Sequence, residues 1–283
     1  MTDIKVIGFH APDAKEQFHE SLHETGFAVL EDHPVNKDLI SSFYQVWTDF
    51  FNTEEKNKNT WLRDPQTHSG YFPYQSENAK GNPEKDLKEF FHIYPFSQMP
   101  AECEIITRKL YSELLDLGTQ LLQWLEVGLP DSVKKVMTHH LSDMLTDSEE
   151  NLMRVLHYPP IEEKEALRAE RAAAHEDINL ITILLAGSEP GLQTKTLQGE
   201  WINVPCQDDM ITVNSADMLQ LATHNYYPSA THRVINPEHG QNNSRYSVPF
   251  FLHPRPDVRL SESHTAKTYL RERLTEIGLG EKK

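Results

Sequence analysis

A histidine and two carboxylates stand together in the segment AAHEDINL, at His175, Glu176 and Asp177. If a strand runs from 175 to 185, residues two apart face the same way, so His175 and Asp177 converge while Glu176 points away. One more histidine from a neighbouring strand would complete a two-histidine, one-carboxylate triad of the kind that holds non-haem Fe(II). The alternative is a solvated charged cluster, because a chain with 15 histidines and 43 acidic residues can supply this spacing by chance.

The best candidate for the third ligand is His232, in the segment SATHRVI. It opens an expected strand in the same half of the chain, so it can lie beside the first two ligands. Four other histidines compete by position alone: His157, His224, His239 and His253.

A candidate anion site lies further along the chain, in the segment RYSVPFF. Arg245 and Ser247 are two residues apart and so share one face of a strand, where a guanidinium and a hydroxyl together suit a carboxylate. The apolar neighbours Val248, Phe250 and Phe251 indicate a mostly buried strand, in which an arginine needs an anion. The alternative is an edge-strand arginine in a surface ion pair.

A second metal motif occurs near the N-terminus, where HESLHETG matches the zinc-protease pattern His-Glu-x-x-His. On a helix, His19 and His23 would share a face with Glu20 beside them, as zinc hydrolysis requires. Two features disfavour this reading: Val29 stands where the longer form of the motif needs a histidine, and Gly26 leads directly into a strand. A zinc hydrolase is therefore kept only as a remote alternative.

The composition excludes several classes of protein. With 27 basic and 43 acidic residues the formal charge of the 283-residue chain is -16, which repels nucleic acid and anionic membrane surfaces. Cys103 and Cys206 show no metal-type spacing and suggest free thiols in a reducing compartment. No signal-like start or apolar run long enough to cross a bilayer is visible. We expect a soluble, cytoplasmic protein without an obligate protein partner.

The arrangement of elements must bring these candidates together. From Asn151 onward, short β-rich segments separated by turn residues predict a sandwich or barrel. Residues 64–81 are expected to form a long loop with a strand inside it. Loops at 71–75 and 88–94, together with the strand end near Phe250, are expected to build the substrate pocket. Before residue 150 we expect strands at 4–9 and 26–31 and helices at 12–25, 36–52, 53–61, 101–127 and 131–147, with a last helix at 264–276.

With HEDINL, THRV and RYS in chain order, the sequence resembles the iron- and 2-oxoglutarate-dependent dioxygenases of the isopenicillin-N-synthase-like group, and in particular its bacterial members. The segment GLQTKTLQGEWINVP is similar to family markers, here Gly191 to Gln193, Gly199 to Trp201 and Val204 with Pro205. The segment NSADMLQLATHNYYPSATHRV resembles the approach to the second histidine, with Ala216 in place of the usual glycine. The segment HETGFAVLEDHPV resembles the N-terminal Gly-Phe strand of the family.

The resemblance implies roles for individual residues. His175, Asp177 and His232 would be the catalytic Fe(II) ligands. Arg245 and Ser247 would bind the distal carboxylate of 2-oxoglutarate, with help from Tyr158 in VLHYPP. The chain departs from the plant pattern at Leu156, where an asparagine near the co-substrate is common. His157 is a possible substitute, but its side chain should face away from that of Tyr158 and is better explained as structural.

The resemblance also implies a fold and a reaction. The fold would be mainly β with a helical layer (α+β): a double-stranded β-helix, or jelly-roll, wrapped by N-terminal helices. The reaction would consume O2 and 2-oxoglutarate, release succinate and CO2, and hydroxylate, desaturate or cyclise a small molecule. The alternative is an iron oxidase of the same family that takes electrons from ascorbate or substrate. We expect one oxygenase unit over 1–283, divided into an N-terminal region 1–100, a helical layer 101–148, a jelly-roll core 150–256 and a C-terminal helix 257–283.

Overall fold

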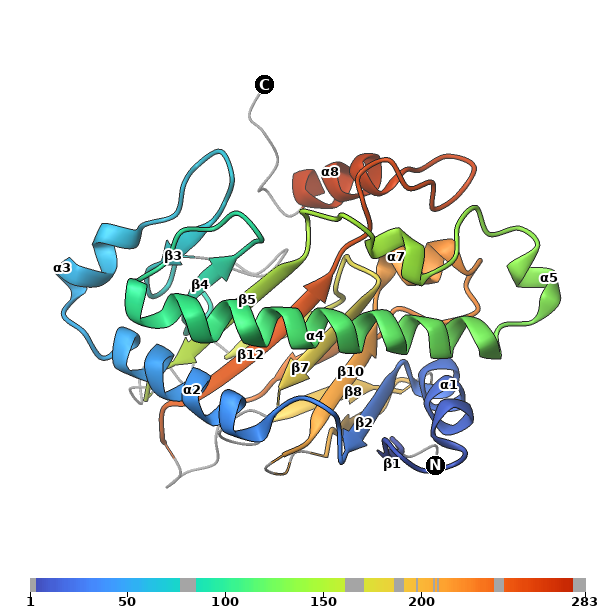
Figure 1. Ribbon diagram of the computed structural model, residues 1–283, viewed down its shortest axis with the longest axis horizontal. Coiled ribbons are helices and arrows are strands. Elements are labelled where there is room, and N and C mark those ends of the chain that lie inside the picture. Colours follow the sequence, from blue (N-terminus) through green and yellow to red (C-terminus); the bar gives the residue numbers. More distant parts are fainter. Residues whose placement is uncertain are drawn as a thin grey trace.

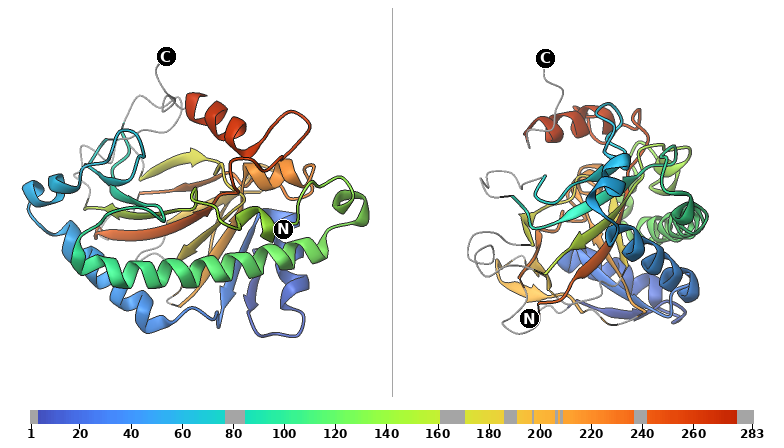
Figure 2. Two further views of the ribbon diagram at one scale, coloured as in Figure 1. Left: turned by 45° about the horizontal axis from the view of Figure 1, so that its top comes forward. Right: turned by 90° about the vertical axis from the view of Figure 1, so that its left-hand side faces the viewer.

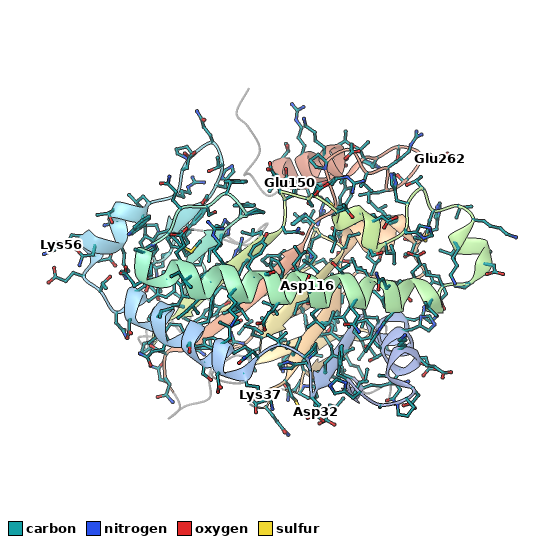
Figure 3. All side chains as sticks on the ribbon, in the orientation of Figure 1. Asp32, Lys37, Lys56, Asp116, Glu150 and Glu262 are labelled. Carbon is teal, nitrogen blue, oxygen red and sulfur yellow. The ribbon has the colours of Figure 1, made fainter. Side chains whose placement is uncertain are left out.

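The computed structural model describes residues 4–76, 85–160, 171–185, 191–196, 198–205, 207, 209–236 and 242–276. Cys206 and His239 lie outside these ranges. Cys103 is buried and carries a free thiol, and burial raises its pKa to about 12. Exposed charged side chains such as Asp32, Lys56 and Glu262 project from the periphery of the molecule (Figure 3).

Two β-sheets form the centre of the fold (Figure 1). The large sheet has the strand order β1-β2-β10-β7-β12-β5-β4-β3, and the small sheet has the order β6-β11-β8-β9. The strands of the large sheet are β1 (Val6–Gly8), β2 (Phe27–Glu31), β3 (Gly70–Phe72), β4 (Glu89–Ile93), β5 (Leu152–Tyr158), β7 (Ile181–Leu185), β10 (Ile211–Ser215) and β12 (Arg245–Leu252). Those of the small sheet are β6 (Ala172–His175), β8 (Leu192–Lys195), β9 (Trp201–Asn203) and β11 (His232–Val234).

Three helices cover the outer face of the large sheet, as the right-hand view of Figure 2 shows for α2 and α4. They are α1 (Ala14–Thr25), α2 (Lys37–Phe51) and α4 (Ala101–Gly128). Helix α4 crosses the strands, and a Cβ built on its Gly118 would lie 2.1 Å from Cδ1 of Leu252 in β12. A side chain at position 118 would displace Leu252, so the glycine lets the helix pack closely on this part of the sheet.

Side chains alternate between the two faces of the large sheet, so its strands take part in two different cores. Outward residues such as Ile183, Val213 and Phe250 join the large core beneath the helices. Inward residues such as Phe27 and Val29 pack against the small sheet. The mixed α+β architecture predicted from the sequence is confirmed.

Two expectations about local structure are wrong. The helix predicted at 131–147 is only α5 (Asp131–Lys134) and a 3-10 turn at Ser142–Leu145, since the residues between them contain β-branched Val136 and Thr138 and two histidines. Residues 88–94, expected as a loop, contain strand β4, which pairs with both β3 and β5. Strands from the first hundred residues therefore extend the large sheet.

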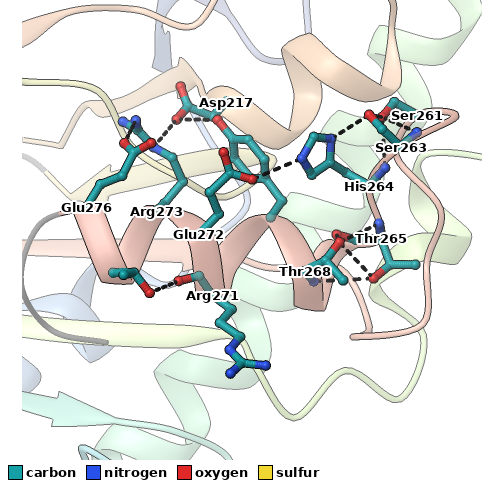
Figure 4. Close-up of polar contacts among 12 residues, drawn as sticks. Asp217, Ser261, Ser263, His264, Thr265, Thr268, Arg271, Glu272, Arg273 and Glu276 are labelled. Carbon is teal, nitrogen blue, oxygen red and sulfur yellow. Dashed lines mark hydrogen bonds and ion pairs between the residues drawn. The ribbon is translucent and has the colours of Figure 1, made fainter. Parts of the chain in front are cut away.

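The C-terminal helix α8 (Ala266–Glu276) lies against the short helix α7 (Asp217–Ala222), as Figure 4 shows. Asp217 accepts hydrogen bonds from Tyr269 in α8 (2.9 Å) and from Ser229 (2.7 Å), and Arg273 lies 3.2 Å from the same carboxylate. The backbone N–H of Asp217 donates to the carbonyl of Asp177 (3.0 Å). The C-terminal helix is thus joined to the segment that carries a candidate metal ligand. No helix in the described part of the chain has the length and apolarity needed to cross a membrane.

Candidate metal centre and co-substrate site

His175, Asp177 and His232 lie together between the two sheets. His175 ends β6 and His232 begins β11, and the two are cross-strand partners with ring centroids 4.4 Å apart. Oδ1 of Asp177 lies 3.9 Å from Nε2 of each histidine. Ligand atoms from the three side chains all lie within 4.8 Å of one another, which is close enough for one metal ion to contact all three.

Asp177 reaches this site by a different route from the one predicted. The expected strand at 175–185 is interrupted, because β6 ends at His175 and β7 begins at Ile181. The residues between them cross from the small sheet to the large one, and it is this crossing, not strand alternation, that places the carboxylate opposite the histidines. Glu176 is exposed, and its Oε1 accepts a hydrogen bond from Thr231 (2.8 Å).

The backbone orients both histidines toward the centre of the cluster. Nδ1 of His175 lies 2.7 Å from the carbonyl of Ala173, and Nδ1 of His232 lies 3.0 Å from that of Ala230. Because a carbonyl oxygen can only accept, each Nδ1 carries the hydrogen and each Nε2 offers a lone pair. Burial and the neighbouring His232 lower the pKa of His175 to about 4, although 42% of its side chain is exposed, so its ring is neutral at pH 7.

The carboxylate of Asp177 is held by the large sheet. Its Oδ2 accepts hydrogen bonds from Thr182 in β7 (2.6 Å) and Asn214 in β10 (3.0 Å), which leaves Oδ1 directed at the histidines. Burial alone would raise the pKa of Asp177, but His232, His175 and these hydrogen bonds outweigh burial and lower it. Two imidazole Nε2 atoms and an ionised carboxylate make a donor set that fits Fe(II).

Removing the Thr182 hydroxyl is expected to weaken metal binding without removing a ligand. In Thr182→Val, Asp177 loses a 2.6 Å hydrogen bond, and the Kd for Fe(II) should rise about 10- to 100-fold, the usual effect of losing such a partner. Thr212→Val is the matched control, because Thr212 is a buried threonine on the same face of β10 as Asn214. Equal Fe(II) affinities of the two variants, measured by anaerobic titration, would contradict this role.

Arg245, Ser247 and Tyr158 also share the inner face. Arg245 pairs with Tyr158 across β12 and β5, and its guanidinium carbon lies 5.4 Å from the centroid of that ring. Ser247 follows two residues later on the same face. All three side chains are at most 4% exposed, so an anion bound there would meet a guanidinium and a hydroxyl largely away from water.

The position of the usual family asparagine is apolar here. Leu156 lies on the inner face in a small cluster with Phe72, Phe90 and Tyr158. His157 faces the opposite way, where its Nδ1 lies 2.7 Å from Glu89, which confirms the expectation that it is structural. Neither side chain therefore supplies a polar contact on the inner face.

The N-terminal zinc motif is engaged in other contacts. Nδ1 of His19 lies 2.6 Å from the hydroxyl of Tyr227, Nδ1 of His23 lies 2.8 Å from the carbonyl of Tyr226, and Glu20 pairs with Lys5. Within the described ranges, the one cluster of three or more such ligands is His175, Asp177 and His232. The zinc-hydrolase alternative is not favoured.

The remaining competitors for the third ligand position are not part of the cluster. His224 is exposed and has a positive φ of 50°. His253 follows directly after β12. Burial lowers the pKa of His253 to about 4, and the nearby negative charge of Asp177 opposes this effect only in part. Its Nδ1 is buried and has no hydrogen-bond partner among the described residues. His253 is thus a neutral side chain near the metal site and outside the ligand set.

Comparison with known proteins agrees with this geometry. The chain matches the family model of the 2OG-Fe(II) oxygenase superfamily over residues 149–254, and that of the non-haem dioxygenase in morphine synthesis N-terminal region over residues 4–110. A crystallised protein from Shewanella oneidensis, described as an oxygenase, is 44% identical, covers 98% of this chain and 99% of its own, and has a TM-score of 0.89. The chain belongs to the 2OG-Fe(II) oxygenase superfamily. It is an iron- and 2-oxoglutarate-dependent dioxygenase with the jelly-roll fold of that superfamily.

More distant relatives align with most of this dioxygenase. Clavatol oxidase claD of Penicillium crustosum is 26% identical, with 95% of this chain and 91% of its own covered. A Neurospora crassa protein crystallised with alpha-KG and thymine has a TM-score of 0.79 at 20% identity, covering 96% of each chain. The latter match shows a shared fold.

Three polar residues of the dioxygenase site were missed in the sequence. Thr182 and Asn214 lie within apolar strand segments, and an isolated polar residue in such a strand is the signal that could have identified them. Arg171 is 1% exposed, and its guanidinium carbon lies 5.9 Å from the ring centroid of Tyr158. Arg171 and Arg245 therefore both approach that ring.

Proposed function

We propose that this dioxygenase couples the oxidative decarboxylation of 2-oxoglutarate to the oxidation of a small organic molecule by O2, releasing succinate and CO2. The organic product would be hydroxylated, desaturated or cyclised. The observation that carries this proposal is the convergence of two Nε2 atoms and one carboxylate oxygen on one point. The positions of Arg245 and Ser247 on the inner face support it further.

Each side chain has a separate task in this proposal. His175, Asp177 and His232 hold the iron, which when bound supplies the redox chemistry with O2 and leaves coordination positions for the keto acid. Arg245 and Ser247 bind the distal carboxylate of 2-oxoglutarate and so fix the direction in which the keto acid lies. The buried ring of Tyr158 packs beside the Arg245 guanidinium and restricts its motion.

An iron oxidase of the same family that does not use 2-oxoglutarate is the second candidate. An enzyme of that kind binds no keto acid, so it would not use a buried arginine and serine at this position to hold one. Both residues are present on the inner face, so the 2-oxoglutarate-dependent reaction is the better supported. Ascorbate is left as a possible additional reductant.

The test is anaerobic addition of Fe(II) and 2-oxoglutarate, followed by admission of air. We expect the weak visible charge-transfer band of the chelate, and then succinate. In Arg245→Gln the 2-oxoglutarate concentration for half-maximal band intensity should rise about 100-fold, because a charged hydrogen-bond partner is lost. Arg233→Gln is the matched control, since Arg233 stacks on Trp201 on the other face of β11. No band with wild-type protein would overturn the proposal.

A small-molecule substrate is also part of the proposal. Crystal structures of relatives include the Neurospora crassa protein in complex with thymine and JOX2 in complex with 2OG, Fe and JA. The formal charge of -16 argues against a nucleic acid polymer as the substrate. We therefore infer that a small molecule enters the space between the sheets.

A further inference from the structure

His253 is a half-buried side chain that belongs neither to the ligand set nor to the proposed 2-oxoglutarate contacts. The even-numbered residues of β12 all lie in the core beneath the helices, so its odd-numbered residues face inward. His253 is the next odd-numbered residue after the end of this strand, and it continues the inner face on which Arg245 and Ser247 lie. The imidazole is therefore placed at the space between the two sheets.

The proposed metal site lies between His253 and the 2-oxoglutarate contacts along β12. Phe251 pairs with Thr182 across β12 and β7, which lie side by side (Figure 1), and the Thr182 hydroxyl donates to Asp177. Ser247 comes six residues before His253, which is about 20 Å of extended chain. A keto acid held at Ser247 thus leaves His253 available to a different molecule on the other side of the metal.

The backbone of His253 is fixed at both of its polar groups. Its N–H donates to Oδ1 of Asn151 (3.0 Å), and its carbonyl accepts a hydrogen bond from the hydroxyl of Ser148 (2.7 Å). Asn151 is itself 1% exposed and donates from its amide nitrogen to the carbonyl of Ser148 (3.2 Å). Because the main chain is already ordered, a ligand that binds the imidazole has little further freedom to remove.

The hydrogen of the His253 ring has one favourable position. Burial lowers the pKa of His253 to about 4, so at pH 7 the ring is neutral and carries a single hydrogen. Nδ1 is buried and has no hydrogen-bond partner among the described residues. A buried N–H without an acceptor is rarer in proteins than a buried acceptor without a donor. The hydrogen therefore belongs on Nε2, which makes this nitrogen a neutral donor.

We propose that Nε2 of His253 donates a hydrogen bond to a carbonyl oxygen of the substrate, so that this dioxygenase oxidises an uncharged carbonyl compound. The inference rests on the proposed function and specifies its substrate class. A neutral donor cannot offset the cost of burying a carboxylate, whereas it satisfies a carbonyl oxygen fully. A hydroxyl group would also need an acceptor for its own hydrogen. The half-buried ring of Phe251, on the same face of β12, would contact the apolar part of the substrate.

The first measurement locates the ring hydrogen. Ring nitrogen resonances are recorded at pH 7 on protein loaded with 2-oxoglutarate and with diamagnetic Zn(II) in place of iron, and those of His253 are assigned by their loss in His253→Gln. We expect a hydrogen on Nε2, none on Nδ1, and a shift of the Nε2 resonance when acetophenone is added. A hydrogen on Nδ1, or on both nitrogens, would overturn the inference.

The second measurement compares ketones with hydrocarbons of similar shape at saturating Fe(II) and 2-oxoglutarate. Acetophenone, indanone and cyclohexanone are paired with ethylbenzene, indane and cyclohexane, and binding is followed by the change in the chelate band and by succinate release. For at least one pair, the ratio of the ketone to the hydrocarbon half-saturating concentration should rise about tenfold in His253→Leu and in His253→Met, which lack the donor. His253→Gln, whose side-chain N–H can replace that of Nε2, should restore most of the wild-type ratio.

The control variant is His10→Leu, which replaces an exposed histidine next to the edge strand β1 and should keep the wild-type ratio. An unchanged ratio in both His253→Leu and His253→Met would overturn the role of His253. A chelate band in wild-type protein that binds none of the three ketones would overturn the substrate class and leave the proposed function intact, whereas absence of the band would overturn both. Loss of the band in His253→Leu and His253→Met would place His253 at the metal or the keto acid and also overturn the inference.

Discussion

The Asp177→Asn variant is expected to lose Fe(II)-dependent turnover of 2-oxoglutarate by more than about 100-fold, whereas Glu176→Gln should retain it. The two substitutions make the same chemical change at adjacent positions. Losing a hydrogen-bond partner of a metal ligand already costs about 10- to 100-fold in affinity or activity, so losing the charge of the ligand itself should cost more. Succinate formation and bound iron, measured for both variants, give the comparison.

The geometry explains why Glu176 cannot replace Asp177 as a metal ligand. Its carboxylate is exposed and accepts a hydrogen bond from Thr231, whereas Asp177 is 7% exposed and is held by two buried donors on the large sheet. An asparagine at 177 would be neutral, and Asn214 would then donate to a weaker acceptor. Equal iron content and turnover in the two variants would show that Asp177 is not a ligand.

The ligand types could be predicted from the sequence because three local signals agree. His175 and Asp177 have the spacing of a ligand pair, His232 opens a strand, and the spacing of Arg245 and Ser247 on one strand predicts a separate anion site. None of these signals is specific alone. Their order along the chain matched one family of iron enzymes. In the structure, ligand atoms of His175, Asp177 and His232 all lie within 4.8 Å of one another.

The route by which Asp177 reaches the site could not be predicted. Strand alternation is a local property, whereas the turn after His175 depends on the second sheet, which supplies Thr182 and Asn214. Strand β4 was missed for a related reason. Its residues are buried on both faces and include Glu89 and His92, whose polarity hides the strand unless their partners on β5 and elsewhere are known.

Glu89→Gln is expected to lower the free energy of unfolding by about 3 kcal/mol, the lower end for removing one partner of a buried ion pair. Glu89 is 4% exposed and lies on the outer face of β4. Its carboxylate contacts the ammonium of Lys58 at 2.7 Å and Nδ1 of His157 at 2.7 Å, and it accepts a hydrogen bond from Tyr71. Glutamine keeps the shape and loses the charge, so the ammonium of Lys58 is left largely without compensation.

The matched control for this loss is Glu55→Gln, which acts on the same ammonium. Glu55 lies 3.3 Å from Nζ of Lys58, but its side chain is 65% exposed, and an exposed partner is worth about 0 to 1 kcal/mol. Denaturant unfolding at pH 7 should therefore separate the two variants clearly. Similar losses of unfolding free energy in the two variants would mean that burial of Glu89 does not strengthen its interaction with Lys58.

The difference in unfolding free energy between wild type and Glu89→Gln should also depend on pH. Burial alone would raise the pKa of Glu89, but the hydrogen bonds from His157, Lys58 and Tyr71 outweigh burial and hold it below the ordinary value of 4.5. A carboxylate with a lowered folded-state pKa contributes stability that is complete above its unfolded pKa and is lost as the pH falls through the folded pKa. The stability gap between wild type and Glu89→Gln should thus be largest near neutral pH and shrink below pH 4.5. A gap that widens in acid would mean that Glu89 is protonated in the folded protein and that the cluster is held by neutral hydrogen bonds.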